Sequence, residues 1–234
     1  MDQAEIFDCL ARKYESCHTY SDCGAVRKVG EHTQHFTFST FYTSPNKFRI
    51  NWSYHKAGRS KTTDNKDPSE SYELWTDGDQ TFTRYYFNDN RIEETNSLED
   101  QLIQAAGISN GVTMLIPAIL LASVNITNKI LDLNDVRQVK LVPCDGDLLY
   151  HFIGAFESPD DTELWIRSGD CAIKQVREHI SCGIEQTEQL RLQFKSLTGV
   201  DGTRLIPANR FYDVETVYEQ VAFDRHLPEK VFTD

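Results

Sequence analysis

Residues 48–55 alternate between apolar and polar side chains. The apolar side chains are Phe48, Ile50, Trp52 and Tyr54. Successive side chains of a β-strand point to opposite faces, so this pattern is typical of a strand with one face against the core. An aspartate in place of Phe48 is therefore expected to be severely destabilising, whereas Arg49 is expected on the solvent face, where a change to aspartate is mild.

Strand-like stretches recur along most of the chain. They cover residues 33–43, 72–76, 81–87, 136–143, 148–156, 163–167, 172–179, 190–195 and 212–221. Several of the turns between them carry a glycine after an aspartate, as in Asp77-Gly78 and Asp145-Gly146, which is typical of hairpins. The pattern predicts about ten strands in an antiparallel meander, and we find no internal repeat among them.

Two segments follow a helical period instead. Residues 3–16 begin with Asp2 and Glu5 at the spacing of a capping box, and residues 97–106 begin in the same way. In both segments apolar residues then recur three and four positions apart, which predicts amphipathic helices.

A third helical segment, about residues 111–123, is apolar nearly all round. A helix of that kind is buried on several sides, and a large open sheet curls to leave an apolar concave face that needs filling. We therefore predict a mainly β (α+β) fold. A curled antiparallel sheet forms an unclosed half-barrel, and two or three short helices cover its concave face. Residues 1–234 are expected to form a single domain.

The charge of the chain argues against a nucleic-acid partner, and its hydropathy argues against a transmembrane segment. The net charge is -12, from 36 acidic and 24 basic side chains, and such a field repels the phosphates of nucleic acid. The longest apolar stretch, residues 114–122, is far shorter than the roughly 20 residues of a spanning helix. The sequence predicts no nucleic-acid partner and no transmembrane segment.

Motifs that carry catalysis are not found. The chain has no glycine-rich phosphate loop, no G-x-S-x-G elbow and no H-E-x-x-H helix. His32 and His35 are three positions apart, which in a strand places them on opposite faces and does not suit a shared metal. Cys17 and His18 are adjacent and could form a nucleophile pair, but a structural or disulfide cysteine is the favoured interpretation. No catalytic residue, metal or cofactor is predicted.

The six cysteines show no zinc-site spacing. Cys17 and Cys23 flank the turn between the first helix and the first strand, and we expect them to be close enough for a disulfide if the protein matures in an oxidising compartment. The residues after Met1 lack the features of a secretory signal. The expected location is therefore periplasmic or in the cell envelope if a signal peptide has been removed, and cytoplasmic otherwise.

Several segments in order resemble the LolA/LolB family of outer-membrane lipoprotein carriers. An N-terminal helix is followed by residues 41–49 (Phe-Tyr-Thr-Ser-Pro-Asn-Lys-Phe-Arg), residues 74–80 (Leu-Trp-Thr-Asp-Gly-Asp-Gln) and a last strand at 214–223 leading to Pro228. These are similar to the "Pro-x-x-Phe" strand start, the "Ser/Thr-Asp-Gly-Lys" hairpin and the "Phe-x-Pro" ending of the family. Ser44 departs from it, because the family has a lid-fastening arginine there.

The resemblance implies a non-catalytic carrier of the bacterial envelope that holds a lipoprotein acyl chain or another hydrophobic ligand, with a membrane-associated protein as a further partner. We expect the hollow to be lined by apolar residues of the sheet and the third helix, namely Phe36, Phe38, Phe48, Ile50, Trp52, Leu74, Met114, Ile116, Leu120 and Leu121. Pro117 weakens that helix, which suits a movable lid rather than a fixed plug. The alternatives are a cytosolic enzyme on the same scaffold that acts on a hydrophobic small molecule, and an envelope sensor or scaffold module.

Overall fold

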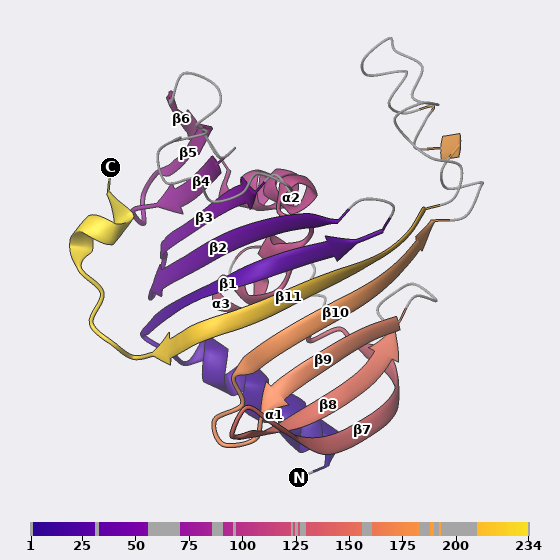
Figure 1. Ribbon diagram of the computed structural model, residues 1–234. Coiled ribbons are helices and arrows are strands. Elements are labelled where there is room, and N and C mark those ends of the chain that lie inside the picture. The colour runs from indigo at the N-terminus through magenta and orange to yellow at the C-terminus, as the bar shows by residue number, and fades with distance from the viewer. Residues whose placement is uncertain are drawn as a thin grey trace, which may run out of the picture.

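The computed structural model describes residues 2–30, 33–55, 71–85, 91–95, 97–122, 124, 126, 130–155, 161–182, 188–189, 192 and 210–233. Within these residues, eleven strands form one antiparallel sheet (Figure 1). The strands are β1 (Thr19–Val29), β2 (Gln34–Thr43), β3 (Lys47–His55), β4 (Ser71–Thr76), β5 (Thr81–Tyr85), β6 (Ile92–Thr95), β7 (Asn134–Cys144), β8 (Asp147–Ala155), β9 (Asp161–Arg167), β10 (Ile173–Cys182) and β11 (Arg210–Phe223). The helices are α1 (Gln3–Glu15), α2 (Leu98–Ile108) and α3 (Ile116–Leu120), and the 3-10 turns are η1 (Val112–Met114) and η3 (Glu229–Phe232).

The sheet consists of two meanders that meet in its centre. Its order is β6-β5-β4-β3-β2-β1-β11-β10-β9-β8-β7, so the first strand pairs with the last. The strands β6 and β7 form the two edges and do not pair with each other, which leaves the sheet unclosed. The predicted mainly β half-barrel is confirmed. Most of the strand predicted at 190–195 lies outside the described residues.

The helices α1, α2 and α3 lie on the same face of the sheet, which we call the inner face (Figure 1). The predicted register of β3 is confirmed there, because Phe48 and Ile50 are at most 1 % exposed and Trp52 is 9 % exposed. Side chains of both meanders and of the helices form one continuous hydrophobic core on this face. The inner face is therefore packed along the length of β3.

Helix α1 starts with the predicted capping box. The backbone N–H of Asp2 donates to the Glu5 carboxylate at 2.8 Å, and the N–H of Glu5 donates to the Asp2 carboxylate at 2.9 Å. These bonds satisfy amide groups that a helix start leaves without partners. The last turn of the helix buries Tyr14, whose hydroxyl accepts a hydrogen bond from the N–H of Ile173 at 3.0 Å.

The third helical segment differs from the prediction. The single helix expected at 111–123 is divided into the short turn η1 and the five-residue helix α3. Pro117 stands in the first turn of α3, where its lack of an N–H costs no hydrogen bond, and its carbonyl accepts the N–H of Leu121 at 3.0 Å. The expectation that Pro117 weakens the helix is therefore wrong.

The opposite, outer face carries a charged network. Arg49 lies on it as the alternation predicts, but only 13 % of its side chain is exposed, so the expectation of a solvent position is wrong. Its guanidinium donates to Glu73 at 2.8 Å and to the carbonyls of Val231 and Thr233 at 3.1 and 3.0 Å. Arg49 thereby attaches the C-terminal segment, drawn in yellow in Figure 1, to the outer face.

Candidate functional site

Most of the residues predicted to line a ligand hollow contact each other in the core instead. Each of them is at most 9 % exposed: Phe36, Phe38, Phe48, Ile50, Trp52, Leu74, Ile116, Leu120 and Leu121. The helices that cover the inner face thus fill the space that a ligand bound against that face would occupy. A ligand reaches these side chains only if the helical layer moves, so their role in binding stays a prediction.

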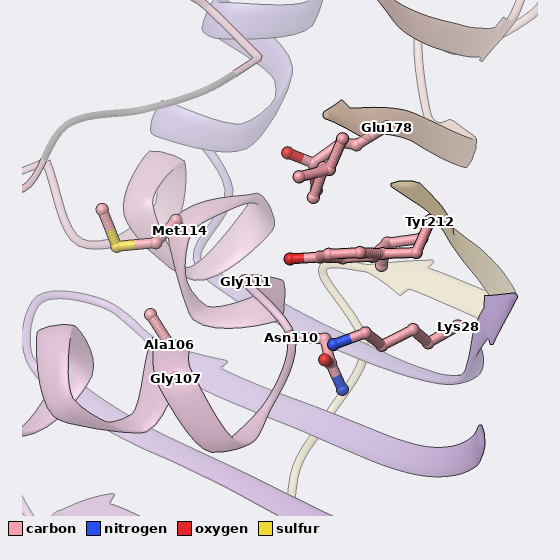
Figure 2. Close-up of a pocket in the computed structure, with 10 residues that line it drawn as sticks. Lys28, Ala106, Gly107, Asn110, Gly111, Met114, Glu178 and Tyr212 are labelled. Atoms are coloured by element: carbon pink, nitrogen blue, oxygen red, sulfur yellow. The ribbon is translucent and has the colours of Figure 1, made fainter. Parts of the chain in front are cut away.

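Met114, the remaining predicted residue, lines a cleft at the rim of this layer. The cleft has a volume of about 330 Å³ and lies between the α2–η1 connection and the inner faces of β1, β10 and β11 (Figure 2). Ligand sites in proteins commonly occupy about 300–1,000 Å³. The cleft is at the small end of that range as it stands.

The pairing of β1, β11 and β10 determines which side chains form the floor of the cleft. Val214 of β11 is the register partner of Lys28 on β1 and of Glu178 on β10. Tyr212 and Ile180, paired with each other, form the adjacent row toward the strand ends. The floor therefore has an apolar centre between one cation and one carboxylate.

The polar groups of the floor lie beside an aromatic ring. The Lys28 ammonium stands 4.1 Å from the centroid of the Tyr212 ring, which is an attractive cation–π geometry. Figure 2 shows the Lys28 amino group and the Asn110 side chain close together, while Glu178 lies on the other side of Tyr212. Glu178 is 8 % exposed.

The roof of the cleft requires an unusual backbone. Asn110 and Gly111 both have positive φ, 52° and 87°, where the chain turns from α2 into η1. Asparagine and glycine tolerate this left-handed conformation better than other residues do. The turn is held by the N–H of Gly111, which donates to the Ala106 carbonyl at 2.8 Å, and it brings Gly111 and Met114 to the edge of the cleft.

A carboxyl group is buried further along the same face. Asp22 is 3 % exposed and accepts hydrogen bonds from the Tyr20 hydroxyl at 2.5 Å and the Thr40 N–H at 3.0 Å. Burial raises the pKa of Asp22 to about 7, although both hydrogen bonds lower it. Because Asp22 is enclosed and is not part of the cleft lining, it has no route to a ligand bound in the cleft.

The cysteines correct one prediction. Cys17 and Cys23 are free, and the disulfide joins Cys9 of α1 to Cys171 in the β9–β10 turn. Cys17 is buried, with its thiol donating to the Tyr14 carbonyl at 3.1 Å. Cys23 alternates with the inward residues Asp22 and Gly24 and so points to the outer face. Although Cys17 and Cys23 are close in sequence, their side chains lie on opposite sides of the sheet, so they do not form a disulfide.

Among the residues that the structure describes, no three histidine, cysteine or acidic side chains are grouped to hold a metal ion. Over the same residues, no helix has the length and apolar character needed to cross a membrane.

The prediction missed the floor residues Lys28, Glu178, Ile180, Tyr212 and Val214. Three of them lie in stretches that were predicted as strands, 172–179 and 212–221. The missing information was which strands are neighbours, because β1 pairs with β11 across almost the whole sequence. No local pattern carries that pairing.

No protein-family profile and no curated protein sequence matches this chain. Solved structures do show similar folds. A LolA superfamily protein from Nitrosomonas europaea aligns over 100 % of this chain and 98 % of its own, with 10 % identity and a TM-score of 0.37. An outer membrane lipoprotein-sorting protein domain from Vibrio parahaemolyticus aligns over 98 % and 95 %, with 7 % identity and a TM-score of 0.38.

A third similar structure is the MucA/MucB complex of Pseudomonas aeruginosa. It aligns over 100 % of this chain but only 61 % of that chain, with 9 % identity and a TM-score of 0.42. At identities this low the similarity is one of fold alone, and no activity is carried over from these proteins.

Proposed function

We propose that this chain is a non-catalytic binding protein of the bacterial cell envelope, which holds the acyl chain of a lipoprotein or another hydrophobic ligand under its helical layer. The cleft beside Met114 is the point of entry. Its apolar floor at Val214 leads directly into the core that the helices cover.

The observation that carries this proposal is the construction of the helical layer. The segment from η1 to α3 buries apolar side chains on every side, yet it consists of a three-residue and a five-residue turn. Helices so short have little stability of their own and depend on tertiary packing. A ligand with an acyl chain offers the same apolar contacts and can replace them.

The disulfide supports the envelope location. Cys9 and Cys171 are separated by 162 positions, and bonds of this kind persist in oxidising compartments such as the bacterial periplasm.

Ligand binding is tested with palmitic acid carrying an anthroyloxy fluorophore. We expect saturable binding to the intact chain. Replacing Met114 with tryptophan enlarges the side chain at the edge of the cleft, and replacing it with glutamine makes that edge polar, so both variants should bind about tenfold more weakly. Ile103→Trp is the matched control, because Ile103 is 50 % exposed on α2 and is not part of the cleft lining. Equal binding by all four proteins would contradict the proposal.

Amide hydrogen exchange tests whether the layer moves. Residues 111–122 should exchange faster than residues 47–54 in the free protein and become protected when the fatty acid is added. If exchange in 111–122 matches that of β3 and no fatty ligand alters it, the layer is a fixed plug and the carrier function is excluded.

A further inference from the structure

Two strands of the sheet contain the same three-residue sequence. Glu73-Leu74-Trp75 lies in β4 and Glu163-Leu164-Trp165 lies in β9. Each is the middle strand of three consecutive strands, β3–β4–β5 in one half of the sheet and β8–β9–β10 in the other. The match is limited to these three residues. Leu74 and Leu164 are both buried in the core, so the glutamate and the tryptophan of each copy lie on the outer face.

In the first copy, the glutamate lies between two basic side chains. Glu73 accepts from Arg49 of β3 at 2.8 Å, and Arg84 of β5 lies 3.4 Å from the same oxygen. Both guanidinium groups also stand over the Trp75 ring, at 5.2 and 5.6 Å from its centroid. We call this set the Trp75 cluster.

The second copy resembles that geometry, but its side chains have further partners. Arg177 donates to Glu215 at 2.8 Å, and His179 is hydrogen-bonded to Glu163 at 3.1 Å. Glu163 is hydrogen-bonded to His151 of β8 at 2.8 Å, and Arg177 of β10 lies 3.4 Å from its other oxygen. Arg177 stands 5.6 Å from the centroid of Trp165, and the His151 ring stacks on Trp165 at 4.4 Å. In this Trp165 cluster, His151 takes the position of Arg49.

The Trp75 cluster holds a peptide segment of the chain itself. Arg49 donates to the carbonyls of Val231 and Thr233, and Lys47 forms an ion pair with Glu229. Phe232 in this segment is 2 % exposed, and it lies outside the main core. The segment thus contributes a buried aromatic side chain, backbone carbonyls and an acidic group.

The Trp165 cluster is more open. Trp165 is partly exposed, whereas Trp75 is 2 % exposed. The Arg177 side chain is 35 % exposed, against 15 % for the equivalent Arg84. Tryptophan and arginine on a surface are the residues most often found at the energetic centre of protein interfaces.

We propose that the Trp165 cluster is a docking surface for a short segment of a partner protein, with the chemistry of the chain's own C-terminal segment. The partner segment places an aromatic side chain against Trp165 and directs backbone carbonyls to His151 and Arg177. The exposed Lys140, register partner of His151 on β7, attracts an acidic residue as Lys47 attracts Glu229. This surface is on the opposite face from the cleft, so it does not depend on ligand binding.

The test uses a fluorescein-labelled peptide with the sequence of residues 225–234 and fluorescence anisotropy on the intact chain. We expect saturable binding that weakens at least tenfold in Trp165→Leu and in His151→Ala, and also when the phenylalanine of the peptide is replaced by alanine. The matched control is Leu141→Ala, because Leu141 is 51 % exposed on β7 but points to the inner face, and it should bind normally. Thermal unfolding of each variant shows that its fold is retained.

Three outcomes would overturn the proposal. One is the absence of binding at millimolar peptide. Another is binding that Trp165→Leu leaves unchanged, which would place the peptide elsewhere, such as at the Trp75 cluster in exchange with the resident segment. The last is dimerisation of the unmodified chain that is lost in Trp165→Leu, seen by analytical ultracentrifugation, which would make a second copy the occupant instead of a separate partner.

Discussion

The hydroxyl of Tyr20 donates a hydrogen bond of 2.5 Å to Asp22, two residues away on the inner face of β1. Both residues are at most 3 % exposed, and burial raises the pKa of the Asp22 carboxyl to about 7. In the unfolded chain this carboxyl titrates near its ordinary value of about 4. The protein therefore buries a group that is protonated only in the native state over part of the pH range.

This pair predicts how stability changes with pH. Between pH 4 and 7 the native state retains the Asp22 proton and the unfolded chain does not, so the contribution of Asp22 to the free energy of unfolding falls as pH rises through this window and is constant above it. Asp22→Asn should be more stable than the parent at pH 8, by up to about 4 kcal/mol, and lose this advantage at pH 4. Urea denaturation of both proteins at the two pH values measures the difference.

Asp170 provides a control of opposite sign. The Arg167 guanidinium lowers the pKa of Asp170, so its carboxylate stabilises the fold at pH 8 and less so at pH 3. Asp170→Asn should be less stable than the parent at pH 8. If both variants changed stability in the same direction at pH 8, the environment assigned to Asp22 would be incorrect.

Gly24 is expected to be indispensable. A Cβ atom at this position would lie 2.2 Å from the Val217 carbonyl oxygen and 2.5 Å from the Phe38 ring, closer than atoms can approach. Gly24→Ala should lower the free energy of unfolding by about 3 kcal/mol. Gly169→Ala, with no atom within 4 Å of its added Cβ, should be close to neutral in the same denaturation experiment.

The Cys9–Cys171 disulfide should contribute strongly to stability. It closes a loop of 162 positions, for which the chain-entropy model gives about 5 kcal/mol. Cys9→Ser should lower the melting temperature markedly under oxidising conditions, whereas Cys144→Ser, at an exposed free thiol, should not. Peptide mapping without reduction identifies the bond, and recovery of a peptide pair joining Cys17 to Cys23 would refute this assignment.

Arg49 should hold the C-terminal segment in place. Arg49→Ala removes two hydrogen bonds to that segment and one ion-pair partner of Glu73, with an expected loss of about 2 kcal/mol. Trypsin should then cleave after Lys230 faster than in the parent protein. Lys47→Ala removes a more exposed ion pair and should change stability by less than about 1 kcal/mol, and equal effects of the two changes would contradict this role.

The elements and the faces that they bury follow from local sequence patterns. The alternation at Phe48, Ile50 and Trp52 is enough to assign a half-buried strand, because each side chain direction follows from its neighbour. The capping box at Asp2 and Glu5 is equally local, and it marks the start of α1. Repeated strands with short turns were sufficient for the mainly antiparallel fold.

Which elements pack against each other depends on long-range contacts that local patterns do not encode. The pairing of β1 with β11 builds the floor of the cleft from Lys28, Val214 and Glu178, and it joins residues nearly 190 positions apart in register. The disulfide partner of Cys9 and the burial of Arg49 under the C-terminal segment depend on the same long-range packing. Hydrophobic and polar patterns indicate which face of an element is buried. The hydrophobic effect is non-directional, so these patterns do not predict which other element covers that face.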